Sequence, residues 1–283
     1  MEASIKLIKE RHSVRNYSSK PIETQKIDKL KEFIHTNTKG PFGNKIRFEI
    51  VDASTYDKDQ LKELGVYGII QGPKFFIAGT VNKGPSSMED FGYCMERNIL
   101  MATSLGLGTC WLGGALDRST FATRLGINGN EIIPAITPIG YSSDKKTFRG
   151  QAIEFIIRAS KRKLFGEIFY NNDNGNPLNE NECGKYTDVL DCVRLAPSAG
   201  NMQPWRIVKE KGVNTFHFYQ KELEAINNSK RNEGARLQNV DMGIAMCHFE
   251  LAAAELGLKG NWEKRMPERM LKGLNYIVTW KEN

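Results

Sequence analysis

The residues best suited to ligand chemistry lie in the stretch Leu195-Ala-Pro-Ser-Ala-Gly-Asn-Met-Gln-Pro-Trp-Arg-Ile-Val208. Two prolines and a glycine interrupt regular structure there, so the pattern predicts the end of a helix, a turn and the start of a strand. Ser198, Asn201 and Gln203 can donate and accept hydrogen bonds in several directions. Such a loop can clamp a polar, polyhydroxylated ligand, although turn chemistry alone slightly favours a plain surface turn.

A second polar cluster is Arg11-His-Ser-Val-Arg15, near the start of the sequence. In an extended chain, residues 11, 13 and 15 project to one side because strand side chains alternate. Two guanidiniums and a hydroxyl at one place match a phosphate and neighbouring polar ring atoms. The alternative is a charged helix end before a turn, and five residues do not decide between the two.

Two further segments could face a ligand. Gly106-Leu-Gly-Thr-Cys-Trp-Leu-Gly-Gly114 ends in a glycine doublet, which indicates backbone that another group approaches closely. Its first Gly-x-Gly is more typical of a helix C-cap. Lys161-Arg162-Lys163 is a dense basic spot, for which a solvated charge run is an equal alternative.

These motifs together resemble one known family. Ala196–Trp205 resembles the APSxxNxQPW loop of the FMN-dependent nitroreductases, and residues 106–114 are similar to that family's GLGtcWigG segment. The family also begins with a similar Arg-x-Ser-x-Arg/Lys and has a basic pair near the place of Lys161–Lys163. The resemblance covers nearly the whole chain and is nearest to the fused, single-chain branch of the family.

The resemblance implies a non-covalently bound FMN. In the family, the proline-rich loop reaches across a dimer interface to the flavin of the partner subunit, and backbone amides at the closing glycines face N5. The arginines and lysines would take the phosphate and the pyrimidine edge, and the polar loop residues would bond the ribityl chain or the ring. The implied cofactor-binding set is Arg11, His12, Ser13, Arg15, Gly113, Gly114, Lys161, Lys163, Pro197, Ser198, Ala199, Asn201 and Gln203.

The implied reaction is hydride transfer from NAD(P)H to FMN N5, followed by reduction of a small-molecule acceptor such as a nitroaromatic or a quinone. This chemistry belongs to the flavin, so no side chain is nominated as a catalytic acid or base. Two alternatives stay open. One is another flavin reaction on the same fold, such as dehalogenation or ring oxidation, and the other is a non-catalytic flavin or small-ligand binder.

Composition excludes several other classes. The 283 residues are 40% hydrophobic and 26% charged, which is ordinary for a globular protein. Acidic and basic residues interleave despite the net charge of +7, so we expect no nucleic-acid partner. No apolar run suits a membrane span and no signal peptide is evident, so we expect a cytoplasmic protein with no membrane partner. The cysteine and histidine spacing predicts neither a disulfide framework nor a metal site.

The patterns also predict the elements that must position these residues. A short helix is expected with Ser4 as its N-cap. Further helices are expected over 21–35, 56–64, 89–105, 186–195 and 240–256. Strands are expected at the ends of the loop-to-strand units 40–51 and 195–208, and at 73–79, 132–141, 153–158, 217–219 and 276–280. The Asn- and Gly-rich segment 171–184 is expected to be a linker or an excursion from the fold.

An internal repeat relates the two halves. Asp90 aligns with Asp241, Gly92 with Gly243 and other helix positions with the same spacing, 241 − 90 = 151. The loops align at a similar spacing, because Asn44 matches Asn201 and 201 − 44 = 157. Constant spacing over a helix and a loop predicts a duplication.

We therefore predict an α+β, nitroreductase-like fold with two duplicated halves, residues 1–168 and 169–283, packed as an internal pseudo-dimer. Family dimers hold one flavin at each side of a two-fold interface. Here the N-terminal half keeps the arginine motif, the glycine doublet and the basic cluster, whereas only the C-terminal half keeps the complete loop. These complementary losses predict one composite site per chain. Because the fused chain contains both sides of the dimer interface of the family, we expect a monomer.

Overall fold

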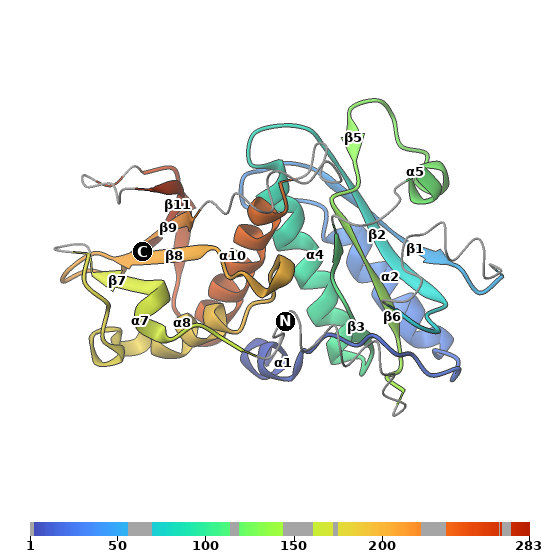
Figure 1. Ribbon diagram of the computed structural model, residues 1–283, viewed down its shortest axis with the longest axis horizontal. Helices are drawn as coiled ribbons and strands as arrows, with labels where there is room; N and C mark the ends of the chain where they lie inside the picture. Colours follow the sequence, from blue (N-terminus) through green and yellow to red (C-terminus); the bar gives the residue numbers. More distant parts are fainter. Residues whose placement is uncertain are drawn as a thin grey trace.

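The computed structural model describes residues 3–55, 70–113, 119–143, 161–171, 175–221, 236–265, 267 and 273–283. Two long helices, α4 (Ser87–Ser104) and α10 (Leu237–Glu255), pack against each other at the centre. Figure 1 shows a β-sheet on each side of this helix pair. The predicted α+β class is confirmed.

The N-terminal sheet has six strands and is antiparallel throughout. Its order is β1-β2-β6-β3, with β4 on β6 and β5 on β2. The strands are β1 (Ile46–Asp52), β2 (Phe75–Asn82), β3 (Gly108–Thr109), β4 (Leu112–Gly113), β5 (Glu131–Ile132) and β6 (Ala135–Gly140). Helix α2 (Thr24–Thr36) contacts β1 and α4, and α5 (Ser119–Leu125) precedes β5.

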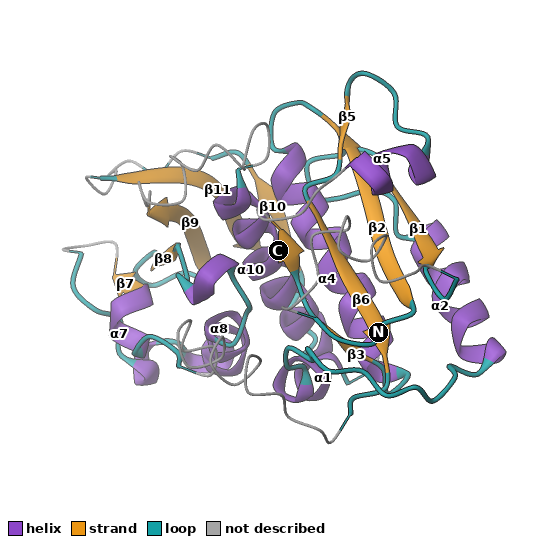
Figure 2. Cartoon of the chain, turned by 45° about the vertical axis from the view of Figure 1, so that its right-hand side comes forward, coloured by secondary structure: helices purple, strands orange, loops and turns teal. Residues whose placement is uncertain are grey.

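The C-terminal sheet has five strands in the order β10-β11-β9-β8-β7, and only β7 and β8 are parallel. The strands are β7 (Phe169–Asn171), β8 (Trp205–Lys209), β9 (Thr215–Lys221), β10 (Gly260–Glu263) and β11 (Leu274–Glu282). Figure 2 shows this sheet and the N-terminal sheet on opposite sides of the central helices. Helix α8 (Thr187–Arg194) packs on α10, and α1 (Ser4–Glu10) contacts α4, α8 and α10.

The two central helices approach closely at a reciprocal pair of glycines. A Cβ atom on Gly92 would lie 2.1 Å from the carbonyl oxygen of Val240, and one on Gly243 would lie 1.9 Å from that of Glu89. The pairs are related by the repeat spacing, since 243 − 92 and 240 − 89 both equal 151. A contact of residue i with j that is repeated by j with i is the pattern of a two-fold interface.

A second pair of contacts follows the same alignment. The backbone N–H of Phe42 donates to Asp90 Oδ1 at 2.8 Å, and that of Ala199 donates to Asp241 Oδ1 at 2.9 Å. Their spacings, 199 − 42 = 157 and 241 − 90 = 151, are those of the sequence repeat. These matching contacts support the duplication, which stays a prediction.

Most sequence-predicted elements are present, with shifted ends. Ser4 is the first residue of α1, and its predicted cap position is taken by Ala3, which makes no side-chain cap hydrogen bond. The expected helix at 56–64 and strand at 153–158 lie outside the described residues. The 171–184 segment was predicted as a linker, but Leu178 is buried and its N–H donates to Phe169 O at 2.9 Å. A short 3-10 helix, η1 (Glu180–Glu182), precedes a second, η2 (Gly184–Tyr186).

The predicted boundary at residue 168 falls inside a packed unit. Helix α7 (Phe165–Ile168) contacts β7, β8 and α8, all of them elements of the C-terminal half. The side chain of Ile168 is buried with Phe169 in the main core. A boundary before α7 would therefore keep this packing within one half.

Candidate functional site

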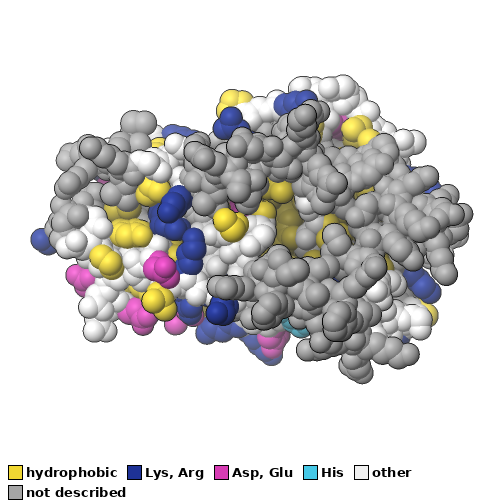
Figure 3. All heavy atoms as spheres, viewed as in Figure 1, with side chains coloured by type: hydrophobic (Ala, Val, Ile, Leu, Met, Phe, Trp, Pro, Cys, Tyr) yellow, Lys and Arg dark blue, Asp and Glu magenta, His cyan; other side chains and the backbone are white. Residues whose placement is uncertain are grey.

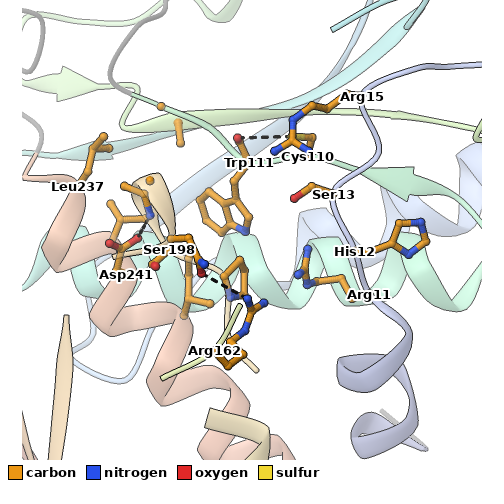
Figure 4. A pocket seen from close by; sticks show the side chains of 18 residues that line it. Arg11, His12, Ser13, Arg15, Cys110, Trp111, Arg162, Ser198, Leu237 and Asp241 are labelled. Atoms are coloured by element: carbon orange, nitrogen blue, oxygen red, sulfur yellow. Dashed lines mark hydrogen bonds between the residues drawn. The ribbon is translucent and has the colours of Figure 1, made fainter. Parts of the chain in front are cut away.

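A cavity of about 580 Å³ lies where the two halves meet. Its walls come from the 11–15 segment, the 110–113 segment, Arg162, the loop at 197–201 and the start of α10 (Figure 4). The lining residues are Arg11, His12, Ser13, Arg15, Cys110, Trp111, Gly113, Ala135, Arg162, Pro197, Ser198, Ala199, Gly200, Asn201, Leu237, Val240, Asp241 and Ile244. Motifs far apart in the sequence thus share one concave site.

The 11–15 segment runs along the edge of the N-terminal sheet in extended form. Ser13 bridges to Thr109, and the N–H of Val14 donates to Thr109 O at 2.8 Å. Figure 4 shows Arg11, Ser13 and Arg15 pointing to the same side, while the His12 ring turns away. The predicted alternation is therefore present, and three of these side chains face the cavity.

Arg11 carries unused hydrogen-bonding capacity. Its side chain is 5% exposed, and its Nε lies 3.7 Å from Glu96 Oε1. Neither Nε nor Nη1 has a hydrogen-bond partner among the residues that the structure describes. Buried N–H groups are nearly always paired in native proteins, so this guanidinium fits a site that receives a polar or anionic ligand.

Arg162 lines the cavity in place of the two lysines that flank it. Its Nη1 donates to Asn201 Oδ1 at 3.3 Å and its Nη2 to Leu195 O at 3.1 Å. Burial, and then the nearby charge of Arg11, lowers the pKa of Arg162 to about 10, so it remains a cation at neutral pH. A second guanidinium therefore adds to the positive potential at the cavity.

Lys161, Lys163 and Gln203 were predicted to contact the ligand, and none of them lines the cavity. Lys163 Nζ donates to Met202 O at 2.9 Å and to Gln203 O at 3.3 Å, so it supports the loop from behind. Burial, followed by the charges of Arg206 and Lys221, lowers the pKa of Lys163 to about 8. In the view of Figure 3, Lys and Arg side chains gather over the C-terminal half of the molecule. The basic cluster marks this segment in the sequence, but nothing in the sequence separates Arg162 from the lysines beside it.

The loop at 197–203 is held in an unusual backbone conformation. Asn201 and Gln203 have φ values of 56° and 49°, in the left-handed region that non-glycine residues rarely adopt. Hydrogen bonds fix them, because Asn201 Nδ2 donates to Lys161 O at 2.8 Å and the Gln203 N–H to Ser198 Oγ at 2.8 Å. Strained backbone of this kind clusters at ligand sites and costs about 1–3 kcal/mol per residue.

Asp241 forms a buried acidic part of the cavity wall. Its Oδ1 accepts the bond from Ala199, whereas its Oδ2 has no hydrogen-bond partner. Burial raises the pKa of Asp241 to about 8, so the carboxyl is mostly protonated at neutral pH. The matching Asp90 differs, since its Oδ2 accepts hydrogen bonds from both the N–H and the side-chain amide of Asn44.

Gly113 is at the cavity wall, where a Cβ atom would lie 3.0 Å from Leu237 Cδ2. The other predicted glycine, Gly114, lies outside the described residues. Across the described part of the chain, no group of three or more His, Cys, Asp or Glu side chains is arranged to hold a metal ion. All five cysteines lie within the described residues, where they are buried and form no disulfide bond.

Sequence comparison assigns the family. Residues 4–253 match the family described as "Putative TM nitroreductase". The chain belongs to this nitroreductase family. No curated protein matches the chain.

One solved nitroreductase structure shares this fold, and others match part of the chain. The structure of a nitroreductase-family protein from Thermotoga maritima MSB8 is similar with a TM-score of 0.61 and 19% identity, over 99% of this chain and 93% of that chain. A Desulfovibrio desulfuricans nitroreductase in complex with FMN matches 52% of this chain and 94% of its own (TM-score 0.40, 19% identity). An FMN-dependent nitroreductase from Clostridium difficile R20291 matches 50% of this chain and 90% of its own (TM-score 0.40, 23% identity).

None of the described helices combines the length and the apolar character that a membrane span needs.

Proposed function

We propose that this nitroreductase-family protein is an FMN-dependent oxidoreductase with one FMN site between its two halves. It would pass a hydride from NAD(P)H through FMN to an acceptor such as a nitroaromatic or a quinone. The observation that carries the proposal is the cavity in which Arg11, Ser13 and Arg15 face the strained 197–203 loop. Its volume of about 580 Å³ is within the usual range for a cofactor site.

The residues at the cavity fit FMN. The guanidiniums of Arg11, Arg15 and Arg162 supply cations for a phosphate and for the polar edge of a ring. Ser198 and Asn201 supply hydroxyl and amide groups for a ribityl chain, with Pro197 and Ala199 as contacts from the same loop. Bound FMN would supply the hydride chemistry at N5, and the protein supplies binding, orientation and electrostatics, including the backbone of Gly113.

A single site per chain is supported by the residues that align with the cavity wall in the other half of the repeat. Cavity-lining Ala199, Val240 and Asp241 align with Phe42, Glu89 and Asp90. The counterpart of Gly113 is Lys264, since 264 − 113 = 151.

Lys264 lies against those three counterparts. Its Nζ is 4.5 Å from the centre of the Phe42 ring, and its charge acts on Glu89 and Asp90. The same ammonium donates a hydrogen bond to Ile277 O. A long cationic side chain thus stands where the N-terminal motif has a glycine, which favours one flavin per chain.

The proposed function is tested by turnover of the FMN-loaded protein. We expect NADH or NADPH to be oxidised when a quinone or nitroaromatic is added, with the ping-pong kinetics of a flavin that alternates between donor and acceptor. Bound FMN without any NAD(P)H oxidation would contradict the enzyme and favour a flavin-binding protein. Turnover restricted to another acceptor class would favour a different flavin reaction on this fold.

We also propose a monomer, because α4 and α10 already supply a reciprocal helix interface within one chain. Light scattering should then give a mass near 32.0 kDa, and a value near twice that would contradict the proposal.

A further inference from the structure

Glu96 is a buried carboxylate at the centre of a cluster that joins four parts of the chain. It lies in α4 and is fully buried. The indole Nε1 of Trp111 donates to its Oε2 at 2.7 Å, and His248 Nε2 lies 2.9 Å from its Oε1. Arg11 Nε is 3.7 Å from the same Oε1. A buried charge is tolerated only when it is paired in this way.

Two of these partners line the cavity, although Glu96 itself does not. Arg11 and Trp111 stand at neighbouring positions of the cavity wall in Figure 4. The ion pair at 3.7 Å is too long for a good hydrogen bond, so it orients the guanidinium without using its N–H groups. Arg11 is therefore held in place and still able to bind a ligand.

His248 connects this cluster to the C-terminal half. Its Nδ1 lies 2.9 Å from the carbonyl oxygen of Cys192, which can only accept, so Nδ1 carries a proton. The other ring nitrogen then faces Glu96 across the α4–α10 contact. A carboxylate oxygen also only accepts, so Nε2 donates to Glu96 Oε1, and the two bonds hold the ring and with it that oxygen of Glu96.

The C-terminal half contains a similar indole–carboxylate hydrogen bond, which is not joined to an arginine of the cavity wall. Trp262 is the counterpart of Trp111, since 262 − 111 = 151, and its Nε1 donates to Glu250 Oε2 at 2.6 Å. Glu250 is partly exposed and has no ion pair with an arginine among the described residues. An indole–carboxylate bond is thus present in both halves, but only Glu96 joins it to a cavity arginine.

We infer that Glu96 is a positioning residue, which rests on the proposed function. It fixes the Arg11 guanidinium so that it meets an electron-rich, anionic edge of the bound cofactor, and its bond to the Trp111 indole holds the cavity wall beside it. Glu96 acts on the cofactor through Arg11 and makes no contact of its own with it. Its effect on binding should therefore disappear once Arg11 is gone.

A double-mutant cycle on FMN affinity tests this inference. Glu96→Gln, Arg11→Ala and the double variant are titrated with FMN by flavin fluorescence. We expect each single variant to raise the Kd about tenfold or more, because each removes a charge-assisted contact. The double variant should bind no more weakly than Arg11→Ala alone. Additive effects would overturn the inference, since a merely structural loss does not depend on Arg11.

Glu250→Gln is the matched control, because it removes the same kind of indole acceptor in the half without the cavity. It should leave the Kd for FMN unchanged. If Glu96→Gln does not fold, Glu96→Asp takes its place in the cycle, because it keeps the charge and shortens the side chain. An unchanged Kd in a folded Glu96 variant would also overturn the inference.

A second readout does not depend on FMN. The indole N–H resonance of Trp111, assigned with Trp111→Phe, should move in Glu96→Gln and stay in place in Glu250→Gln. A wild-type protein that binds no FMN would contradict the proposed function, and this resonance would still test whether Glu96 holds the cavity wall. A resonance that does not move would overturn the positioning role.

Discussion

Gly243→Ala is expected to destabilise the protein by more than about 3 kcal/mol, at or above the upper end for overpacked cores. The new Cβ atom would lie 1.9 Å from Glu89 O and 2.8 Å from Tyr93 N. These are backbone atoms of α4, so no side chain can move aside and the two central helices must separate. Alanine gains about 1 kcal/mol of helix propensity over glycine, which is too little to offset the clash.

Urea unfolding of Gly243→Ala measures this cost, with Gly129→Ala as the control. Gly129 has nothing within 4 Å of its added Cβ atom and should give a free energy of unfolding close to that of the wild type. A Gly243→Ala midpoint equal to or above the wild-type midpoint would show that the helices are not in this close contact.

Asp241→Asn is expected to remove a loss of stability that the wild-type protein suffers as the pH rises. Burial raises the pKa of Asp241 from 3.8 to about 8 in the folded state. Between these values the folded protein binds more protons than the unfolded chain, so the free energy of unfolding falls with pH. Each pH unit costs up to ~1.4 kcal/mol from this one group. Well below pH 3.8 the group is protonated in both states, and the free energy of unfolding no longer depends on pH through it.

The measurement is the free energy of unfolding of apoprotein at pH 5 and pH 8. The asparagine keeps an oxygen for the Ala199 N–H, and any fixed packing cost is the same at both pH values. We expect the stability of Asp241→Asn relative to the wild type to rise by a few kcal/mol from pH 5 to pH 8. The exposed Asp28→Asn is the control and should show no such trend. A constant difference for Asp241→Asn would refute a buried, protonated carboxyl.

The sequence motifs predicted which segments meet at the site, but not every side chain that faces it. Arg11, Ser13 and Arg15 were found because extended backbone alternates in a way that spacing reveals. Lys161 and Lys163 were predicted instead from the resemblance of this cluster to the basic pair of the family. The buried Arg162 lines the cavity in their place.

Glu96 and Asp241 could not be assigned from the sequence. Both lie on helices whose burial is nearly complete all round, so periodicity does not show which face meets a ligand. The role of Glu96 arises from the α4–α10 contact, which brings it to His248. The role of Asp241 arises where α10 meets the turn at Ala199–Asn201. The packing of Leu178 was missed for a similar reason, because a single apolar residue in a polar stretch carries no period.

The central claim is one FMN in a composite cavity. It is tested most directly by the visible absorption spectrum of the purified, FMN-supplied protein, with the flavin-to-chain ratio after denaturation. We predict about one FMN per chain. The ratio should fall sharply in Arg15→Ala and Asn201→Ala and stay unchanged in Arg47→Ala, whose arginine pairs with Glu131 instead of lining the cavity. Two FMN per chain would contradict the single site, and no FMN would contradict the cofactor and the proposed function.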